Sequence, residues 1–128
     1  MKILVIDEEF PYPLNTGKRI RSFNLASALS RDNEVTYLAY GETDSEGYRW
    51  LQQAGLNPIA AGELRRKKSG PMFYWRLLAN LLSPDPYIVT HHYTARFRNK
   101  LNELLAGDPY DVIICEWTPY ARYVRDIH

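Results

Sequence analysis

The sequence predicts an α/β fold, in which a Rossmann-like parallel sheet is sandwiched by helices. Strand-like and helix-like segments alternate along the 128 residues, as in proteins built from strand–helix–strand units. The strand-like segments are continuously apolar, which is typical of strands that are covered on both faces. Crossovers between parallel strands are right-handed, so the connecting helices are expected on both faces of one sheet.

The first half of the chain contains three predicted strands and two predicted helices. The strands are expected at 2–7, 35–40 and 57–61, and the helices at 17–31 and 44–54. A broad apolar side of the first helix, at 3.6 residues per turn, is formed by Ile20, Phe23, Leu25, Ala26 and Leu29. Thr43 and Glu46 have the spacing of a capping box, which is expected to begin the second helix.

The second half contains two long predicted helices, a strand and a short final helix. The helices are expected at 71–82 and 95–105, and the strand at 111–116. Thr118 and Pro119 then supply an N-cap and a first-turn proline for the last helix. The strand is apolar on both faces, which is typical of an interior strand, and no later strand follows it. We therefore expect the chain to be an N-terminal piece of a longer polypeptide.

Composition excludes several classes of protein. An apolar content of 45% with 24% charged residues is typical of a globular domain rather than a disordered chain. The net charge of +1 gives no global argument for nucleic-acid binding. The single cysteine, Cys115, excludes an internal disulfide and disfavours a zinc site, which fits a reducing compartment. No segment has the roughly 20 apolar residues of a membrane span. Together with the single cysteine, this leads us to expect a cytoplasmic protein, soluble or peripheral at the inner membrane face.

The carboxyl ends of the strands are the expected ligand site, because ligands of parallel α/β sheets gather there. The segments after Asp7, Tyr40, Ala61 and Glu116 should therefore line one crevice. Glu116 follows an interior strand and is expected to face this crevice, whereas Cys115 fits a small core residue. His92 and its neighbour His91 are expected in a loop, where one of them could meet a substrate.

The first turn of the first predicted helix carries positive side chains, which are unfavourable at that end of a helix. Lys18, Arg19 and Arg21 oppose the partial positive charge of a helix N-terminus, at about 0.3–1 kcal/mol each. Free backbone N–H groups near Gly17 and these cations together predict an anion site. The alternative is a solvated basic face, with Arg21 and Arg31 paired to surface acids. One glycine and no Gly-Lys-Ser/Thr ending disfavour both a dinucleotide fingerprint and a P-loop.

Asp7, Glu8 and Glu9 form an acidic cluster at the end of the first strand. Such a cluster could hold a metal, transfer a proton or orient a hydroxyl-rich ligand. Alternatively, one acid caps the loop and the others are solvated. Three adjacent residues cannot all face one site, so we expect no metal.

A basic run at 65–68 precedes a helix, within 71–82, that is apolar nearly all round. The segment from Arg65 to Leu82 could contact an anionic membrane surface, where each basic residue contributes about 1 kcal/mol. Burial of the helix between the sheet and further parts of the polypeptide is the favoured alternative.

A receiver domain of two-component signalling is one alternative function. Receivers also begin with an apolar strand and an acidic pair, but they carry a phosphoryl-accepting Asp near the end of strand three. The region 50–56 contains no acid, and the similar pattern at 111–119 offers Glu116 and lies too late. A small anion-binding α/β module is the other alternative.

Several segments resemble the N-terminal domain of family-four glycosyltransferases, which have the two-Rossmann-domain GT-B fold. The resemblance is strongest over residues 2–40. It includes the opening strand, the Pro-x-Pro-x-x-x-Gly-x-x-Ile-Arg loop at 11–21, and the segments 22–29 and 33–38. The segments 82–87, 95–105 and 110–114 extend it over most of the chain.

This resemblance implies retaining, metal-independent transfer of a sugar from a nucleotide-diphosphate sugar to a glycan, lipid-linked or small-molecule acceptor. No cofactor is expected besides the nucleotide sugar, which is a co-substrate. The N-terminal domain would bind the acceptor, for which the candidate residues are Asp7, Glu8, His92 and Glu116. Its first loop would approach the donor diphosphate, for which the candidates are Asn15, Thr16, Gly17 and Arg21.

The resemblance also bears on domain organisation. Residues 1–128 would form the acceptor-side domain, and a C-terminal domain of the same polypeptide would carry most donor contacts and a Glu-x7-Glu motif. We therefore expect the 128-residue chain to be inactive alone. Many members of the family have paired glycines in the first loop, where this chain has only Gly17.

Overall fold

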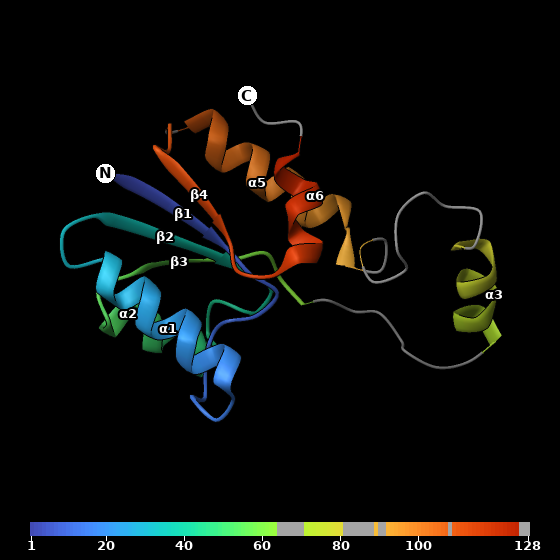
Figure 1. The fold of residues 1–128 in the computed structure, drawn as a ribbon, viewed down its shortest axis with the longest axis horizontal. Coiled ribbons are helices and arrows are strands. Elements are labelled where there is room, and N and C mark those ends of the chain that lie inside the picture. The colour runs from blue at the N-terminus through green and yellow to red at the C-terminus, as the bar shows by residue number, and fades with distance from the viewer. Residues whose placement is uncertain (64–70, 81–88, 90–91, 108, 126–128) are drawn as a thin grey trace.

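Four parallel strands form the sheet at the centre of the computed structural model, which describes residues 1–63, 71–80, 89, 92–107 and 109–125 (Figure 1). The strands are β1 (Lys2–Ile6), β2 (Glu34–Ala39), β3 (Asn57–Ala60) and β4 (Val112–Cys115). Their order in the sheet is β3-β2-β1-β4, and all pairs are parallel. This order is that of a Rossmann-type sheet, so the predicted α/β, Rossmann-like fold class is confirmed.

Helices cover both faces of the sheet (Figure 1). One face is covered by α1 (Gly17–Leu29) and α2 (Glu46–Gln53), and the other by α5 (Ala95–Gly107), the 3₁₀ turn η1 (Thr118–Tyr120) and α6 (Ala121–Val124). The described helix α3 (Pro71–Asn80) lies within the predicted helix at 71–82. The basic residues 65–68 and residues 81–82 lie outside the described part of the chain.

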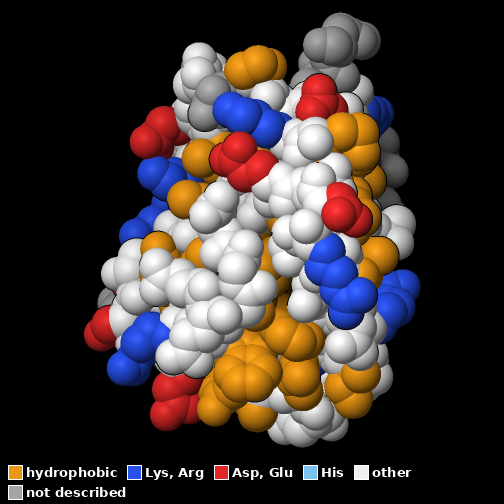
Figure 2. All heavy atoms as spheres, turned by 90° about the vertical axis from the view of Figure 1, so that its left-hand side faces the viewer, with side chains coloured by type: hydrophobic (Ala, Val, Ile, Leu, Met, Phe, Trp, Pro, Cys, Tyr) orange, Lys and Arg blue, Asp and Glu red, His pale blue; other side chains and the backbone are white. Residues whose placement is uncertain are grey.

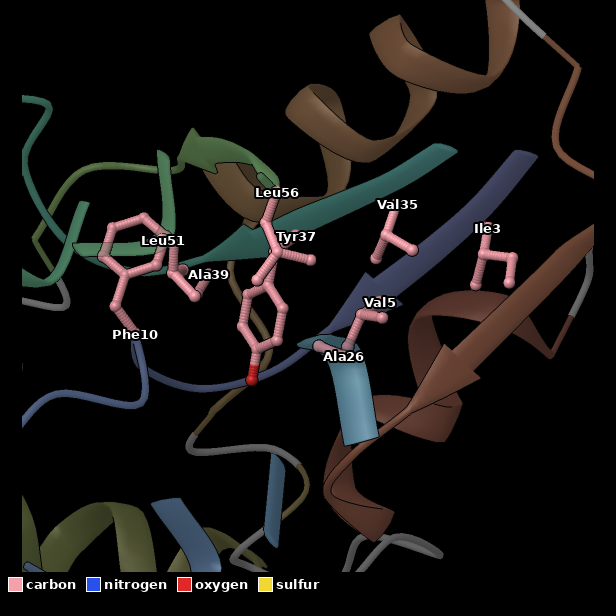
Figure 3. Close-up of a cluster of buried hydrophobic side chains, with 9 residues drawn as sticks. All are labelled: Ile3, Val5, Phe10, Ala26, Val35, Tyr37, Ala39, Leu51 and Leu56. Carbon is pink, nitrogen blue, oxygen red and sulfur yellow. The ribbon is translucent and has the colours of Figure 1, made fainter. Parts of the chain in front are cut away.

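Two hydrophobic clusters, one on each face, hold these layers together. Alternate residues of a strand point to opposite faces, and β1 divides accordingly. Ile3 and Val5 pack on the α1 side, where Tyr37 and Ala26 join them (Figure 3). The opposite cluster is made of Leu4, Ile6, Leu38, Tyr40, Ala61, Phe97, Leu101, Tyr120 and Tyr123. Because both sets are buried, the strands had to be continuously apolar.

The predicted apolar side of the first helix is only partly correct. Ser22 and Ala26 are its buried residues, whereas Ile20 and Leu25 are 43% and 42% exposed. Figure 2 shows a hydrophobic patch at the level of α1 and α2, below interleaved acidic and basic side chains. The buried side of α1 instead includes a small polar residue, Ser22, which has a specific partner described below.

Two predicted helix caps are wrong. The N-cap of α2 is Ser45, whose hydroxyl accepts the Tyr48 N–H at 3.3 Å, because a turn from Glu42 to Ser45 leaves Thr43 outside the helix. Thr118 is the first residue of η1 and not its cap, while Pro119 does lie in the first turn.

The last strand lies at an edge of the described sheet. β4 pairs with β1 from Val112 to Cys115, and no described strand lies on its other side. Val112 is 39% exposed, and the other β4 residues are half-buried. Among the described residues, β4 therefore has one neighbouring strand, whereas an interior strand has two.

Candidate functional site

The candidate site begins where β1 and β4 end side by side. Ile6 is paired with Cys115, so Asp7 and Glu116 are the first residues beyond two neighbouring strands. The Glu116 N–H continues the ladder by donating to the Ile6 carbonyl at 3.0 Å. The strand register thus brings two carboxylates 109 positions apart in sequence to one edge of the sheet, beside the start of α1.

Asp7 is the buried centre of this site, with a side chain that is only 1% exposed. Its Oδ1 accepts the Glu8 N–H at 2.7 Å and lies 2.7 Å from Lys18 Nζ, and its Oδ2 accepts the Tyr37 hydroxyl at 2.8 Å. Burial raises the pKa of the Asp7 carboxyl above its ordinary value of 3.8, although the Lys18 ammonium works in the opposite direction. A buried carboxylate with three partners is a fixed feature of the site.

Lys18 connects this buried carboxylate to the surface. Its Nζ also lies 2.7 Å from Glu8 Oε1 and 5.5 Å from the centre of the Trp117 ring. Burial lowers the pKa of Lys18, but hydrogen bonds to Asp7 and Glu8 raise it more, so the net shift is upward. The ammonium is therefore held in its charged form between two carboxylates.

Arg19 and Glu9 form a second ion pair with two parallel hydrogen bonds. Arg19 Nε and Nη2 donate to the two Glu9 oxygens at 2.8 and 2.7 Å, the planar geometry that arginine and carboxylate favour. Arg19 lowers the pKa of Glu9, and Glu9 raises that of Arg19. Arg19 Nη1 donates to Asn15 Oδ1 at 3.0 Å, and Thr16 Oγ1 accepts the Arg19 N–H at 3.3 Å as the N-cap of α1.

Glu116 forms the third ion pair, with Arg21. The Glu116 side chain is 4% exposed, and its Oε2 lies 2.9 Å from Arg21 Nη2. Ser22 Oγ donates to the same oxygen at 2.6 Å, which explains why a polar residue occupies the buried side of α1. The Arg21 side chain is 66% exposed and remains open to solvent on its outer side.

The predicted anion site has less free positive charge than the sequence indicates. Each cation of the first turn contacts a carboxylate within 2.9 Å. An anion would meet the Gly17 and Lys18 amides, which have no hydrogen-bond partner among the described residues, and the exposed side of Arg21. A Cβ added at Gly17 would meet nothing within 4 Å, so the geometry does not require glycine there.

His92 joins the site indirectly. It is buried, with 8% exposure, and its ring lies 4.6 Å from that of Trp117, which in turn lies beside Lys18. The carbonyl of His92 accepts the Tyr123 hydroxyl at 2.8 Å. His92 therefore packs against Trp117 and supports the site through that ring.

The four predicted crevice segments divide into two pairs. The segments after β2 and β3 contact each other through an isolated bridge between Gly41 and Gly62, with an N–O distance of 3.1 Å. The polar cluster is built by the other pair, after β1 and β4. The site therefore lies over two strand ends rather than four.

The sequence does not indicate the partners inside the site or a neighbouring pocket. The sequence identifies Lys18 only as a basic residue, Ser22 as a small residue and Tyr37 as a strand residue. Their roles in the site depend on the sheet register. A pocket of about 210 Å³ beside the β1–α1 loop is lined by Tyr12, Glu46, Arg49, Trp50 and Gln53. The rings of Tyr12 and Trp50 lie 5.8 Å apart.

Among the described residues, no group of three or more His, Cys, Asp or Glu side chains could hold a metal ion. None of the described helices is both long and apolar enough to cross a bilayer. In α3, Tyr74, Trp75 and Leu78 are 64%, 69% and 57% exposed.

Comparisons with known proteins add no relative to this description: the chain matches no protein-family model, no curated protein and no solved structure.

Proposed function

We propose that the chain is the acceptor-binding domain of a retaining glycosyltransferase, which transfers a sugar from a nucleotide-diphosphate sugar to a glycan, lipid-linked or small-molecule acceptor. The observation that carries this proposal is the placement of Glu8 and Glu116 beside the buried Asp7, at the carboxyl ends of two adjacent strands. Carboxylate oxygens accept hydrogen bonds, and a hydroxyl-rich ligand supplies the matching donors.

The ion pairs favour a hydroxyl-rich ligand over a free anion at this edge. They hold the carboxylates in fixed orientations while leaving acceptor atoms available, because no described residue hydrogen-bonds Glu8 Oε2 or Glu116 Oε1. A site whose polar groups are held in position before binding loses less freedom when the ligand arrives.

The pocket beside the β1–α1 loop provides a second support. Tyr12 and Trp50 present aromatic rings, and Glu46 and Gln53 present polar groups beside them. Small-molecule sites combine apolar and aromatic walls with a few placed polar groups. An acceptor sugar could stack on the rings and hydrogen-bond at the rim.

The donor would approach from the start of α1. In this proposal its diphosphate meets the free Gly17 and Lys18 amides, with Asn15, Thr16 and Arg21 beside them. A second Rossmann-like domain, as in the resembling family, supplies most donor contacts, and no metal or cofactor takes part. The protein acts in the cytoplasm, where the exposed side chains of α3 contact that domain or the membrane.

The strand order disfavours the receiver alternative. Receivers have the flavodoxin-like order 2-1-3-4-5, whereas this sheet has β3-β2-β1-β4. β3 therefore lies at the edge of the described sheet, far from the central position that a phosphoryl-accepting strand occupies in that order.

The decisive experiment measures sugar transfer from a panel of nucleotide sugars by the complete product of the gene and by residues 1–128 alone. We expect transfer by the first and none by the second. Glu116→Gln should lower kcat/KM at least tenfold, whereas Glu103→Gln, on an exposed part of α5, should leave it unchanged. No transfer with any donor, together with no saccharide-induced shifts in nuclear magnetic resonance spectra around Asp7 and Trp50, would reject the proposal.

A further inference from the structure

Three arginines converge on one pocket on the opposite side of the sheet from α1. The pocket has a volume of about 270 Å³ and is lined by Tyr93, Arg98, Arg122 and Arg125. It is built from the start of α5 and from α6, and it shares no lining residue with the candidate site. No Asp or Glu among the described residues lines it, whereas the α1 site contains several carboxylates.

Stacked tyrosine rings lie beneath the arginine side chains. The Tyr93 ring stacks on the buried Tyr123 ring, with centres 4.9 Å apart and planes at 19°. The Tyr123 hydroxyl accepts the Thr94 N–H at 2.7 Å and donates to the His92 carbonyl at 2.8 Å. Helix α6 is thus fixed to the segment that precedes α5.

Two of the arginines contact these two tyrosines. Arg98 Nη1 donates to the Tyr123 carbonyl at 2.6 Å, and no described residue accepts a hydrogen bond from its other guanidinium nitrogens. The Arg122 guanidinium lies 4.7 Å above the centre of the Tyr93 ring, a favourable cation–π arrangement. Arg125 is exposed at the end of α6.

Local roles explain individual arginines but not their convergence. Arg98 satisfies a helix carbonyl and Arg122 stacks on a ring, yet neither contact requires a third guanidinium at the same pocket. The convergence instead places three guanidinium groups around one cavity, an arrangement with the donors that an anion requires.

We propose that the arginine pocket binds a phosphate group carried by a small ligand. Guanidinium groups match phosphate with paired hydrogen bonds, which makes arginine the preferred partner of this anion. Sites for drug-sized ligands have volumes of about 300–1,000 Å³, so a pocket of about 270 Å³ fits one phosphate group better than a whole nucleotide sugar. The phosphate belongs to a soluble phosphomonoester or to an anionic lipid headgroup.

The test is a titration of the 128-residue chain with inorganic phosphate at constant ionic strength, followed by amide shifts in nuclear magnetic resonance spectra. We expect shifts at 93–98 and 121–125. The double variant Arg122→Gln/Arg125→Gln should raise the phosphate Kd at least tenfold. The matched control Arg31→Gln/Lys100→Gln removes the same charge elsewhere and should change the Kd less than twofold.

Arg125→Gln alone provides a second measurement, since this exposed side chain has no hydrogen bond among the described residues and its loss should not disturb folding. It should raise the Kd at least threefold. Equal Kd values for the two double variants, or shifts confined to 16–19 at the start of α1, would overturn the proposal.

A vesicle experiment distinguishes the two sources of phosphate. Sedimentation with phosphatidylglycerol vesicles, but not phosphatidylcholine vesicles, that is lost in Arg122→Gln/Arg125→Gln would assign the pocket to a lipid headgroup. Arginine-dependent binding of inorganic phosphate without vesicle binding would assign it to a soluble phosphomonoester. Vesicle binding that both double variants lose equally would reflect net charge and would count against the pocket.

Discussion

The basic residues at the start of α1 and those of the α5–α6 pocket differ in two respects. They differ in how far apart they lie in sequence and in whether described acidic residues accompany them. Lys18, Arg19 and Arg21 are close in sequence, yet each contacts a carboxylate in the structure. Arg98 and Arg122 are distant in sequence, yet they line one pocket whose described lining residues include no acid. A basic cluster in a sequence is therefore a poor guide to free positive charge in a fold.

The two sets of basic residues should therefore differ in their effect on stability. Those of α1 hold the loop after β1, the end of β4 and the first helix together, so their removal should lower stability. In the pocket, Arg125 has no hydrogen bond among the described residues and lies beside two like charges, so its removal should not lower stability. The following variants test this contrast, beginning with the largest expected effect.

Lys18→Met should have the largest effect, because it leaves Asp7 buried without a cation. Breaking a buried ion pair by removing one partner lowers the free energy of unfolding by about 3 kcal/mol or more. Lys100→Met is the matched control: Lys100 pairs with the exposed Glu103 at 3.0 Å, and such surface pairs contribute less than about 1 kcal/mol. Urea unfolding measures both, and equal losses would contradict a structural role for the Asp7–Lys18 pair.

Ser22→Ala should have the next largest effect. The variant removes the hydroxyl that donates to buried Glu116 at 2.6 Å, and hydrogen bonds to charged groups contribute about 1.5–3 kcal/mol. We expect a loss of about 2 kcal/mol in urea unfolding. Ser27→Ala, also on α1, is the control and should lose less than about 0.5 kcal/mol. A neutral Ser22→Ala would show that Arg21 alone holds Glu116.

Glu9→Gln should have a smaller effect that depends on pH. Arg19 lowers the pKa of folded Glu9 below 4.5, so the stability from this pair is present above pH 4.5 and is lost as the pH falls through the folded pKa. The Glu9 side chain is 39% exposed, so we expect a loss of about 1 kcal/mol or less at neutral pH. Urea unfolding across the acid range should show the two proteins converging, and a constant difference would exclude this ion pair as the cause.

Arg125→Gln should have the smallest effect on stability. Since its charge lies beside two other arginines, the free energy of unfolding should rise slightly or stay within about 0.5 kcal/mol of the original. Thermal unfolding without added phosphate measures this. A loss as large as that of Lys18→Met would remove the contrast between the two regions.

Much of the fold could be predicted because the sheet is covered on both faces. Ile3 and Leu4 lie on opposite faces and are both buried, so β1 had to be apolar throughout, and this pattern is visible in the sequence. The cap at Ser45 and the exposure of Ile20 could not be predicted, because they depend on a local turn and on the direction in which α1 packs.

The position of the site in the fold could be predicted, but the contacts between its residues could not. Asp7 and Glu116 follow apolar strands, and that alone indicates the carboxyl edge of a parallel sheet. The pairing of Arg21 with Glu116 spans 95 residues and depends on the register of β4 against β1. The arginine pocket was missed for the same reason, since nothing local to α5 or α6 indicates that they meet.

The buried phenols set an upper pH limit for this protein. Tyr37, Tyr120 and Tyr123 have no exposed side-chain surface, and burial raises the pKa of each above the ordinary value of 10.0. Unfolding restores the ordinary value, so the unfolded chain releases protons first and stability falls as the pH rises above 10.0. Alkali should therefore unfold the sheet cooperatively, with the phenolate absorbance of these three rings rising as the structure is lost.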